Sequence, residues 1–464
     1  MNKRSVLTVI LILSGISSAF AGGILTNTNQ SAHFIRMVAR DASTQIDAAY
    51  TNPAGLTKLK DGFHFSFSNQ SAFQTRTITS TFSPFATFGG NATKEFKGTA
   101  SAPIIPSLQA AYKTGRWVLS GNIAVTGGGG KATFNRGLPS FEAQLAVLPT
   151  AITALGVETT QYSVDAYMRG SSFIYGAQMG GSYEINDMFS AYAGFRLNIV
   201  NNGYEGYLKN VQVNPQHPLI NPSGGMMSAA QFLTAAGKPE LAAMVADREI
   251  DNKQSGWGVN PILGLNFNYK GLNIGMKYEF KTSLDVESKT IDGKDGGLDQ
   301  FKDGVNTPHD IPALFTVGAS YQITSRLLAS VGYHHFFDSD AQMSNDKQKY
   351  INGGTNEYLF GAEYQIDRMF LVSAGAQITR YGVTDDYQQD LSFSINSYSV
   401  GLGGAVNVAK NVRINVGYFW TTYSDWSKEN EKYATIPGTD VSLPGKDVFS
   451  RTNKVFSAGV DFSF

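Results

Sequence analysis

Residues 189–199 read FSAYAGFRLNI, and this stretch shows the pattern that decides the fold. Its odd-numbered positions are apolar, from Phe189 to Ile199, while its even-numbered positions are small or polar and include Arg196. Successive side chains of a β-strand point to opposite faces, so this order gives one apolar and one polar face. The stretch therefore predicts a strand that separates an apolar from a polar environment.

The same alternation recurs along most of the chain after residue 62. It is clear in four further stretches: 63–68, 272–281, 370–379 and 456–464. Segments of this kind number fourteen and begin near residues 62, 96, 116, 162, 188, 255, 272, 310, 326, 356, 369, 391, 412 and 450. Their polar faces are rich in Gly, Ser, Asn and Gln and carry few charges. Their apolar faces end in aromatic residues, as at Tyr269, Tyr321, Tyr364 and Phe464.

The connections between these segments alternate in length. One set is very short and lies at 114–115, 186–187, 270–271, 324–325, 367–368 and 410–411. The other set is long and lies at 78–95, 127–161, 208–254, 288–309, 340–355, 383–391 and 427–449. Short turns on one side and long loops on the other are typical of bacterial outer-membrane barrels. The sequence therefore predicts an all-β fold, a 14-stranded antiparallel transmembrane β-barrel of the outer membrane, with both termini on the periplasmic side.

Composition excludes several other classes of protein. Charged residues make up 16% of the chain, against roughly 25% in a typical soluble domain, and the formal net charge is zero. Without a basic tract we expect no nucleic-acid partner, and without cysteine there is no disulfide or thiolate metal site. No His or carboxylate cluster has metal-ligand spacing, so we expect no metal and no cofactor. A Ser–His–acid hydrolase would need His64, His334 or Asp461 in contact with a serine, and serines are so common on this face that we expect no enzyme.

The first 61 residues do not share the alternation. In residues 1–21, Lys3 and Arg4 precede an apolar run over 6–16, and Ala19 and Ala21 stand before the expected cleavage site of a signal peptide. Residues 22–61 are irregular, and they are too long for a simple leader. A 14-stranded barrel encloses a lumen wider than its own side chains fill. We therefore expect residues 22–61 to form a hatch inside a barrel built from residues 62–464.

Several motifs in the mature chain are similar to those of a known family. Asp41-Ala42-Ser43 stands eleven residues upstream of Asn52-Pro53-Ala54-Gly55-Leu56, just before the first strand. Weaker pieces are Gly256-Trp257-Gly258-Val259-Asn260 with Gly264, Ile311-Pro312-Ala313 with Gly318, and the terminal Phe464. With these motifs the chain resembles the FadL/TodX family of outer-membrane long-chain fatty-acid and hydrocarbon transporters.

The resemblance implies a fourteen-stranded barrel whose N-terminal hatch carries the Asn52, Pro53, Ala54 and Gly55 motif. It also implies passive diffusion of hydrophobic molecules, which pass from extracellular loops to an internal site and leave sideways through the wall. The loops depart from those of the fatty-acid members, so the substrate stays open. The expected partners are hydrophobic small molecules and outer-membrane lipids, and the expected state is a monomer.

Two of the long loops have helical patterns. The stretch 139–155 predicts an apolar stripe on a helix that Ser140 caps and Pro149 kinks, and 226–249 predicts two short helices. The apolar side chains of these helices are Phe141, Leu145, Leu148, Ile152, Phe232 and Leu233. They either pack onto the barrel rim and each other or collect an apolar ligand, and the two interpretations are compatible.

Prolines and glycines mark one seam of the predicted wall. Pro103 and Pro106 lie on the second strand, where each removes a ladder donor, and Gly127 and Gly128 open the glycine run that ends the third strand. These residues either form bulges that shape the wall or leave a gap between strands two and three. The family resemblance favours the gap, through which an apolar ligand would leave.

Four basic residues are candidates for binding a ligand carboxylate. Arg196, Lys277 and Arg413 have inward parity on their strands, and Arg36 lies in the hatch. Charge-assisted hydrogen bonds would suit a carboxylate. The alternative is a set of structural ion pairs, since Glu279 and Glu363 share the inward parity.

Three functions from different classes fit these observations. The leading hypothesis is a channel for passive uptake of hydrophobic molecules, most of all long-chain fatty acids. A general diffusion porin would need a charged constriction and no hatch. A surface adhesin or antigen would use the long loops to bind a partner.

Overall fold

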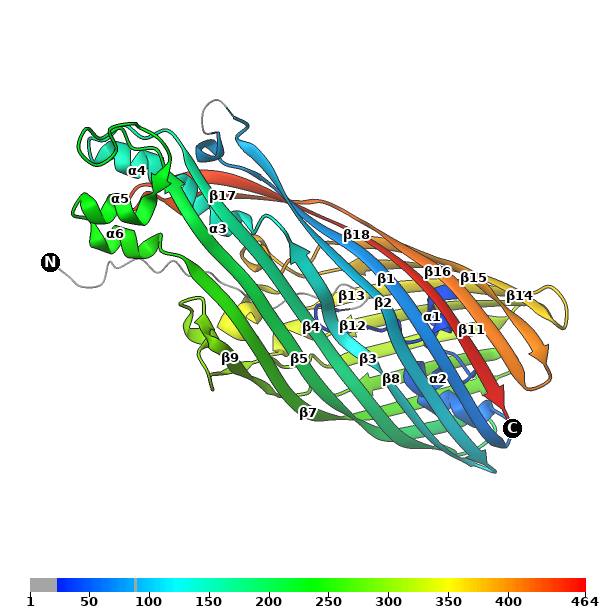
Figure 1. Cartoon of the computed structure of the whole chain (residues 1–464). Coiled ribbons are helices and arrows are strands. Elements are labelled where there is room, and N and C mark those ends of the chain that lie inside the picture. The colour runs from blue at the N-terminus through cyan, green and yellow to red at the C-terminus, as the bar shows by residue number, and fades with distance from the viewer. Residues whose placement is uncertain (1–22, 87–89) are drawn as a thin grey trace.

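The computed structural model describes residues 23–86 and 90–464, and its main feature is a closed antiparallel β-barrel (Figure 1). Its 14 wall strands pair in a ring that closes where β18 (Ser442–Ser463) pairs with β1 (Gly62–Thr81). The other wall strands are β2 (Thr93–Thr114), β3 (Trp117–Phe134), β4 (Tyr162–Glu184), β5 (Phe189–Val213), β7 (Arg248–Tyr269), β8 (Leu272–Glu279), β11 (Leu314–Gln322), β12 (Leu327–Phe336), β13 (Thr355–Gln365), β14 (Phe370–Arg380), β15 (Ser397–Ala409) and β16 (Val412–Tyr423). The predicted fold class is confirmed; the predicted signal peptide lies outside the described residues.

Smaller elements occupy the lumen and the long-loop end. Four strand segments extend the sheet there: β6 (Met227–Ser228), β9 (Asp285–Asp295), β10 (Asn306–Pro308) and β17 (Trp426–Thr435). The helices are α1 (Ala32–Arg36), α2 (Ala48–Thr51), α3 (Pro139–Ala146), α4 (Leu148–Ala154), α5 (Ala229–Ala235) and α6 (Pro239–Met244). Short 3₁₀ segments are η1 (Pro53–Lys58), η2 (Ser83–Phe85), η4 (Asp299–Phe301), η5 (Asp338–Asp340), η6 (Ser344–Tyr350) and η7 (Asp385–Tyr387). Among the described residues, no helix is both long and apolar enough to cross a membrane.

Four predicted strand starts are wrong. The last strand, predicted from about 450, begins at Ser442, because it continues past its ladder with β1 and pairs there with β17. The twelfth wall strand, β15, begins at Ser397 and not near 391, because Leu391, Phe393 and Ile395 fold inward and are buried in the loop core. The strand predicted from 310 begins at Leu314. The strand predicted from 255 begins earlier, at Arg248, because its ladder with β5 continues to the Leu208–Arg248 pair.

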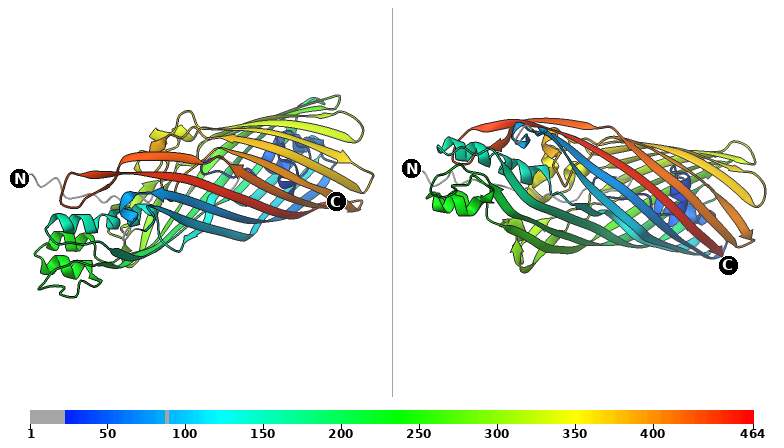
Figure 2. Two further views of the ribbon diagram at one scale, coloured as in Figure 1. Left: turned by 90° about the horizontal axis from the view of Figure 1, so that it is seen from above. Right: turned by 45° about the horizontal axis from the view of Figure 1, so that its top comes forward.

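The short and long connections lie at opposite ends of the barrel. In the turn between β7 and β8, Lys270 and Gly271 have φ of 46° and 84°, the left-handed values that a tight two-residue hairpin requires. Figures 1 and 2 show α3 to α6 gathered at the other end, away from the C terminus. The helical stretch 139–155 divides at Val147, with Pro149 in the first turn of α4. Ser140 does not cap α3: its backbone N–H donates to Asp390.

The outer face of the barrel is apolar and its inner face is polar. On β1, Phe63 and Phe73 are half-exposed on the outside, while His64, Ser66 and Gln70 between them point inward and are buried. Exposed aromatic side chains form similar pairs on other strands, such as Phe189 and Tyr207 on β5. An apolar outer band bounded by aromatic residues is what a lipid-facing barrel requires.

Candidate functional site

The N-terminal segment, residues 23–61, lies inside the barrel, where α1 and α2 are seen behind the wall strands in Figure 1. Ser31 begins α1 and accepts a hydrogen bond from the Phe34 N–H. The described chain starts at Gly23 beside Phe336, at the loop end of β12, and reaches the turn end only at Asp61. The segment therefore runs from the long-loop side to the short-turn side, where the barrel begins at Gly62 beside the C-terminal Phe464.

Glycines on the inner wall allow this segment to approach closely. A Cβ at Gly275 would lie 2.1 Å from the Asp41 carbonyl oxygen, and one at Gly417 would lie 2.8 Å from the Arg36 nitrogen. The same close approach to the segment occurs at glycines of five more strands: Gly318, Gly332, Gly361, Gly375 and Gly401. Any larger residue at these positions would push the segment off the wall from β8 to β16.

The Asn52–Gly55 motif binds the segment to two further wall strands, β5 and β7. The Asn52 side-chain amide donates to the Ser43 carbonyl at 3.0 Å and to Asn266 Oδ1 at 2.8 Å. The Ala54 carbonyl accepts a 2.7 Å hydrogen bond from the Ser190 hydroxyl. A Cβ at Gly55 would meet the Ser43 carbonyl at 2.6 Å, which explains the glycine. The motif therefore positions the segment against β5 and β7.

Three of the four carboxylate-binding candidates are held in buried ion pairs. Arg36 donates to Glu363 Oε1 at 2.6 Å. Arg196 contacts Glu279 through two nitrogens, and Lys277 Nζ lies 2.6 Å from the same carboxylate. Since each of these three cations already pairs with a buried carboxylate, this geometry favours the structural alternative for them.

The fourth candidate, Arg413, lies near the short-turn end. Its Nε donates to Asn407 Oδ1 at 2.9 Å, and its side chain is half-buried. It lines a polar cavity of about 840 Å³, partly open to solvent, together with Arg40 and Arg326. This cavity lies on the far side of the N-terminal segment from the loops, so Arg413 is not close to Arg196 or Lys277.

The wall is interrupted between β2 and β3. Their ladder stops at the Ala100–Ala132 pair and resumes at the Leu108–Ile123 pair, which leaves residues 101–107 and 124–131 unpaired with each other. Pro103 and Pro106 lie in this interval and cannot donate to a ladder. On the β1 side the interval faces Gln70 and Ala72, so it lies toward the loop-side aromatic Phe73.

The glycines of β3 form a bend beside this interruption. Gly128 and Gly130 have φ of 92° and 69°, values that residues with a Cβ rarely adopt. A Cβ at Gly127 would lie 2.2 Å from the Leu25 carbonyl, and the Gly128 N–H donates to that carbonyl at 3.0 Å. The bend therefore turns β3 away from β2 and toward the N-terminal segment.

Residues 26–30, which we call the N-terminal strap, lie on the inner side of this interruption. On one side Asn29 and Gln70 of β1 exchange hydrogen bonds. On the other side Gln30 Nε2 donates to the Val125 carbonyl at 3.1 Å, and the Asn27 N–H donates to Thr126 at 2.8 Å. The strap thus bridges β1 to β3 behind the unpaired part of β2, a feature that no sequence signal indicated.

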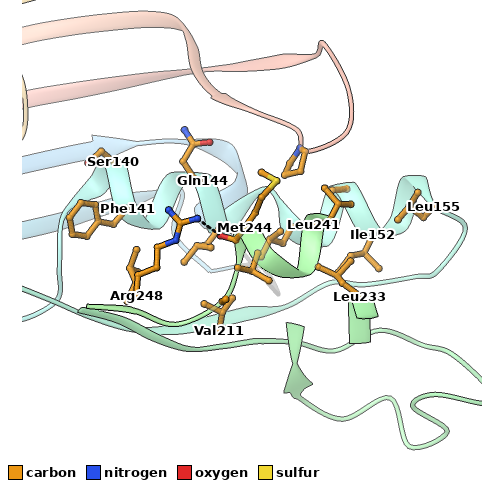
Figure 3. A pocket seen from close by; sticks show the side chains of 17 residues that line it. Ser140, Phe141, Gln144, Ile152, Leu155, Val211, Leu233, Leu241, Met244 and Arg248 are labelled. Carbon is orange, nitrogen blue, oxygen red and sulfur yellow. Dashed lines mark hydrogen bonds between the residues drawn. The ribbon is translucent and has the colours of Figure 1, made fainter. Parts of the chain in front are cut away.

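The two helical loops meet around an apolar cleft (Figure 3). It encloses about 790 Å³ of space, partly open to solvent, within the range of small-molecule sites. Five predicted capture residues line it: Phe141, Leu145, Leu148, Ile152 and Leu233. Phe232 is buried in the adjoining apolar core and does not line the cleft. Arg248 and Gln144 supply the polar groups at its edge, as Figure 3 shows.

One buried acid links the start of the N-terminal segment to the loops. Asp338 accepts hydrogen bonds from the Thr355 hydroxyl at 2.6 Å and from the backbone N–H of Ile24. Burial raises the pKa of Asp338 to about 7, although the hydrogen bonds from Thr355 and Ile24 oppose this shift. Sequence reasoning missed Asp338, because nothing in a loop sequence shows that the residue will be buried.

The comparisons with known proteins agree with this architecture. No protein-family model matches the chain, and no curated protein sequence matches it. Among solved structures, a FadL homologue of Pseudomonas aeruginosa superposes with a TM-score of 0.63 at 14% identity, covering 97% of this chain and 100% of that one. The P. putida toluene transporter TodX gives 0.54 at 16% identity, covering 91% and 95%. The Ralstonia pickettii toluene transporter TbuX gives 0.51 at 15%, covering 90% and 94%. The likeness shows that this chain has the fold of these proteins, the fold that the sequence motifs implied.

Proposed function

We propose that this protein is an outer-membrane channel for the passive uptake of hydrophobic molecules, with long-chain fatty acids as the principal substrate class. The observation that carries the proposal is the interruption between β2 and β3, from residues 101 to 107, in a wall whose outer face is apolar. An unpaired stretch of barrel wall is tolerated in lipid only where its backbone groups meet polar or hydrated surroundings. A lateral exit from the lumen supplies such surroundings.

The route begins at the loops. The apolar cleft lined by Phe141, Leu145 and Leu233 collects ligand from the outside, because it offers apolar surface with few polar groups. Ligand then moves into the lumen and leaves through the interruption in the wall. With the long loops outside the cell, the interruption lies in the outer-leaflet half of the apolar band, since it faces Phe73 rather than Phe63.

The N-terminal segment acts as the hatch of this channel. It fills the lumen between the loops and the short-turn end, and its wall contacts close the direct path to the periplasm. The chain acts as a monomer, surrounded by outer-membrane lipids, and no catalytic step is proposed. The structural neighbours are named as transporters or as a FadL homologue, which supports the same class of function.

A general diffusion porin is the alternative that this geometry disfavours. A porin needs an open aqueous lumen, whereas α1, α2 and η1 are buried inside this barrel. The lumen charges near the segment, such as Arg36 with Glu363, are used in ion pairs. The adhesin alternative rests on the loops alone, and their apolar cleft is accounted for by ligand capture.

The test is uptake of radiolabelled palmitate by cells that have this protein as their only hydrophobic-uptake channel, compared with cells lacking it. We expect palmitate uptake to depend on the protein, while planar-bilayer recordings show little ion conductance. Large, steady ion conductance with palmitate uptake equal in both strains would contradict the proposal and favour a porin.

A further inference from the structure

A row of inward polar side chains crosses six strands at one level of the wall. Each member lies directly opposite the next, and in order they are Asp461, Ser66, Gln109, Asn122, Gln178 and Arg196. Both ends of the row are hydrogen-bonded. The Ser66 hydroxyl donates to Asp461 at 2.7 Å, and Arg196 donates to Gln178 Oε1 at 2.6 Å. The row is therefore a continuous polar belt except at its centre.

The two central amides break this belt. Gln109 and Asn122 are each 1% exposed, yet none of their four amide nitrogen and oxygen atoms has a hydrogen-bond partner among the described residues. The hydroxyl of Ser120, the previous inward residue of β3, has none either. Buried polar groups in native proteins are nearly always paired, and a cluster of unpaired ones needs an explanation. Replacing one of these amides with an apolar residue of similar size should cost little folding stability, because no hydrogen bond is lost.

The position of the two amides supplies an explanation. They pair one rung below Leu108 and Ile123, the first rung after the interruption in the wall. Any molecule that leaves through the interruption therefore passes directly above Gln109 and Asn122. The strap closes the same space from the other side, and Gln30 Oε1 there is also unpaired.

The charged side chains at this level have partners within the protein. Asp461 lies 3.1 Å from His33 Nε2, and Arg196 shares the Glu279 carboxylate with Lys277. The centre of the row, formed by Gln109 and Asn122, thus offers hydrogen-bond donors and acceptors but no charged side chain. An amide presents both kinds of group, as do a hydroxyl and an un-ionised carboxyl, whereas a carboxylate only accepts.

We propose that Gln109 and Asn122 bind the uncharged polar head group of an amphiphilic ligand during its lateral exit. The inference rests on the proposed function and narrows its substrate class to long-chain molecules with a hydroxyl or protonated carboxyl head. A pure hydrocarbon leaves the amides unpaired and is bound less tightly. The head group completes the polar belt while the chain enters the membrane through the interruption.

The test compares binding of 1-hexadecanol and n-hexadecane to the full-length protein in lipid nanodiscs. Two good neutral hydrogen bonds should make wild-type affinity for the alcohol higher by roughly tenfold or more. In Gln109→Leu/Asn122→Leu this preference should fall by about the same factor, mainly because the alcohol loses these two hydrogen bonds. Gln254→Leu is the matched control, since it removes a buried inward glutamine of β7 that donates to Ser288 of β9, outside the row.

The outcomes separate the two levels of the proposal. Equal wild-type affinities for alcohol and alkane, or an alcohol preference that survives the double substitution, would overturn the head-group site and leave the channel intact. A loss of preference in Gln254→Leu as large as in the double variant would also overturn it. Failure of both probes to bind wild-type protein would instead refute the uptake function itself. Sodium hexadecyl sulfate should bind equally to the wild type and to the double variant. If the double variant lost hexadecyl sulfate binding as strongly as it lost hexadecanol binding, the site would not be selective for uncharged head groups.

Discussion

A disulfide across the interrupted seam is expected to stop uptake. If the ladder below the interruption continued for three more rungs beyond Leu108 and Ile123, residue 105 would lie opposite residue 126. The perturbation is therefore Ile105→Cys with Thr126→Cys, in a chain that has no native cysteine. A disulfide requires Cα atoms about 4.4–6.8 Å apart, which is possible here only if β2 and β3 come together.

The magnitudes follow from the interrupted length and the contacts that must be lost. Eight residue steps from Ala100 to Leu108, at about 3.3 Å each, give an opening about 26 Å long, which the bridge would divide into parts of roughly 10 and 17 Å. Closing it removes three hydrogen bonds, at about 0.5–1.5 kcal/mol each: the one that Gly128 of β3 donates to Leu25, and the two that Asn27 and Gln30 donate to β3 carbonyls. These losses total about 1.5–4.5 kcal/mol, and a disulfide that has formed is a covalent bond that holds the two strands together in spite of them.

The assay is the initial rate of palmitate uptake before oxidation, after oxidation and after reduction, with the bridged fraction measured by mass spectrometry. We expect uptake to fall about tenfold or more on oxidation and to recover on reduction. The matched control is Leu108→Cys with Ile123→Cys, a pair already adjacent in the ladder, whose bridge should leave uptake unchanged. A fully bridged Ile105→Cys/Thr126→Cys protein that transports at its reduced rate would refute the lateral route.

Three further predictions concern the N-terminal segment. Glu363→Gln leaves Arg36 and Arg40 without their shared carboxylate, and loss of one partner of a buried pair should lower the free energy of unfolding by about 3–5 kcal/mol, measured by urea titration. The pKa of Asp338 is raised in the fold, so its protonated form is favoured and wild-type stability should fall as pH rises from about 4 to 7. Asp338→Asn should remove that slope in thermal melts, and an unchanged slope in the variant would contradict the role of Asp338. Deleting residues 23–30 should leave the barrel folded and raise single-channel conductance, because the strap and its contacts to β1 and β3 are lost; conductance equal to wild type would show that the strap does not obstruct the lumen.

The sequence was sufficient for the barrel itself. Period-two alternation, as in residues 189–199, fixes which side chains face lipid, and turn residues such as Lys270-Gly271 fix where strands reverse. Both signals are local, so they can be read without knowing the neighbouring strands. The strand start near 391 failed because Leu391, Phe393 and Ile395 also alternate, but they fold into the loop core instead of continuing the wall.

The candidate site was harder to predict from the sequence, because its contacts depend on the register between strands. Lys277 and Glu279 lie two residues apart on β8, so their parity already placed them side by side, but only the register of β5, β7 and β8 brings Arg196 to Glu279. The unpaired amides of Gln109 and Asn122 look like any other inward polar residues, and only their opposition beside the interruption sets them apart. The strap gave no signal, since its contacts join residues nearly 100 positions apart, as between Gln30 and Val125.

The path of the ligand is the central claim, and photo-crosslinking tests it most directly. A palmitate analogue with a diazirine at the end of its chain would be bound to the protein in nanodiscs, activated by light and mapped by mass spectrometry. The account predicts adducts at the loop cleft around Leu145 and Leu233 and along both edges of the interruption, at residues 101–107 and 124–131. Adducts spread evenly around the lipid-facing surface, with none at the cleft and no excess at the interruption, would contradict it.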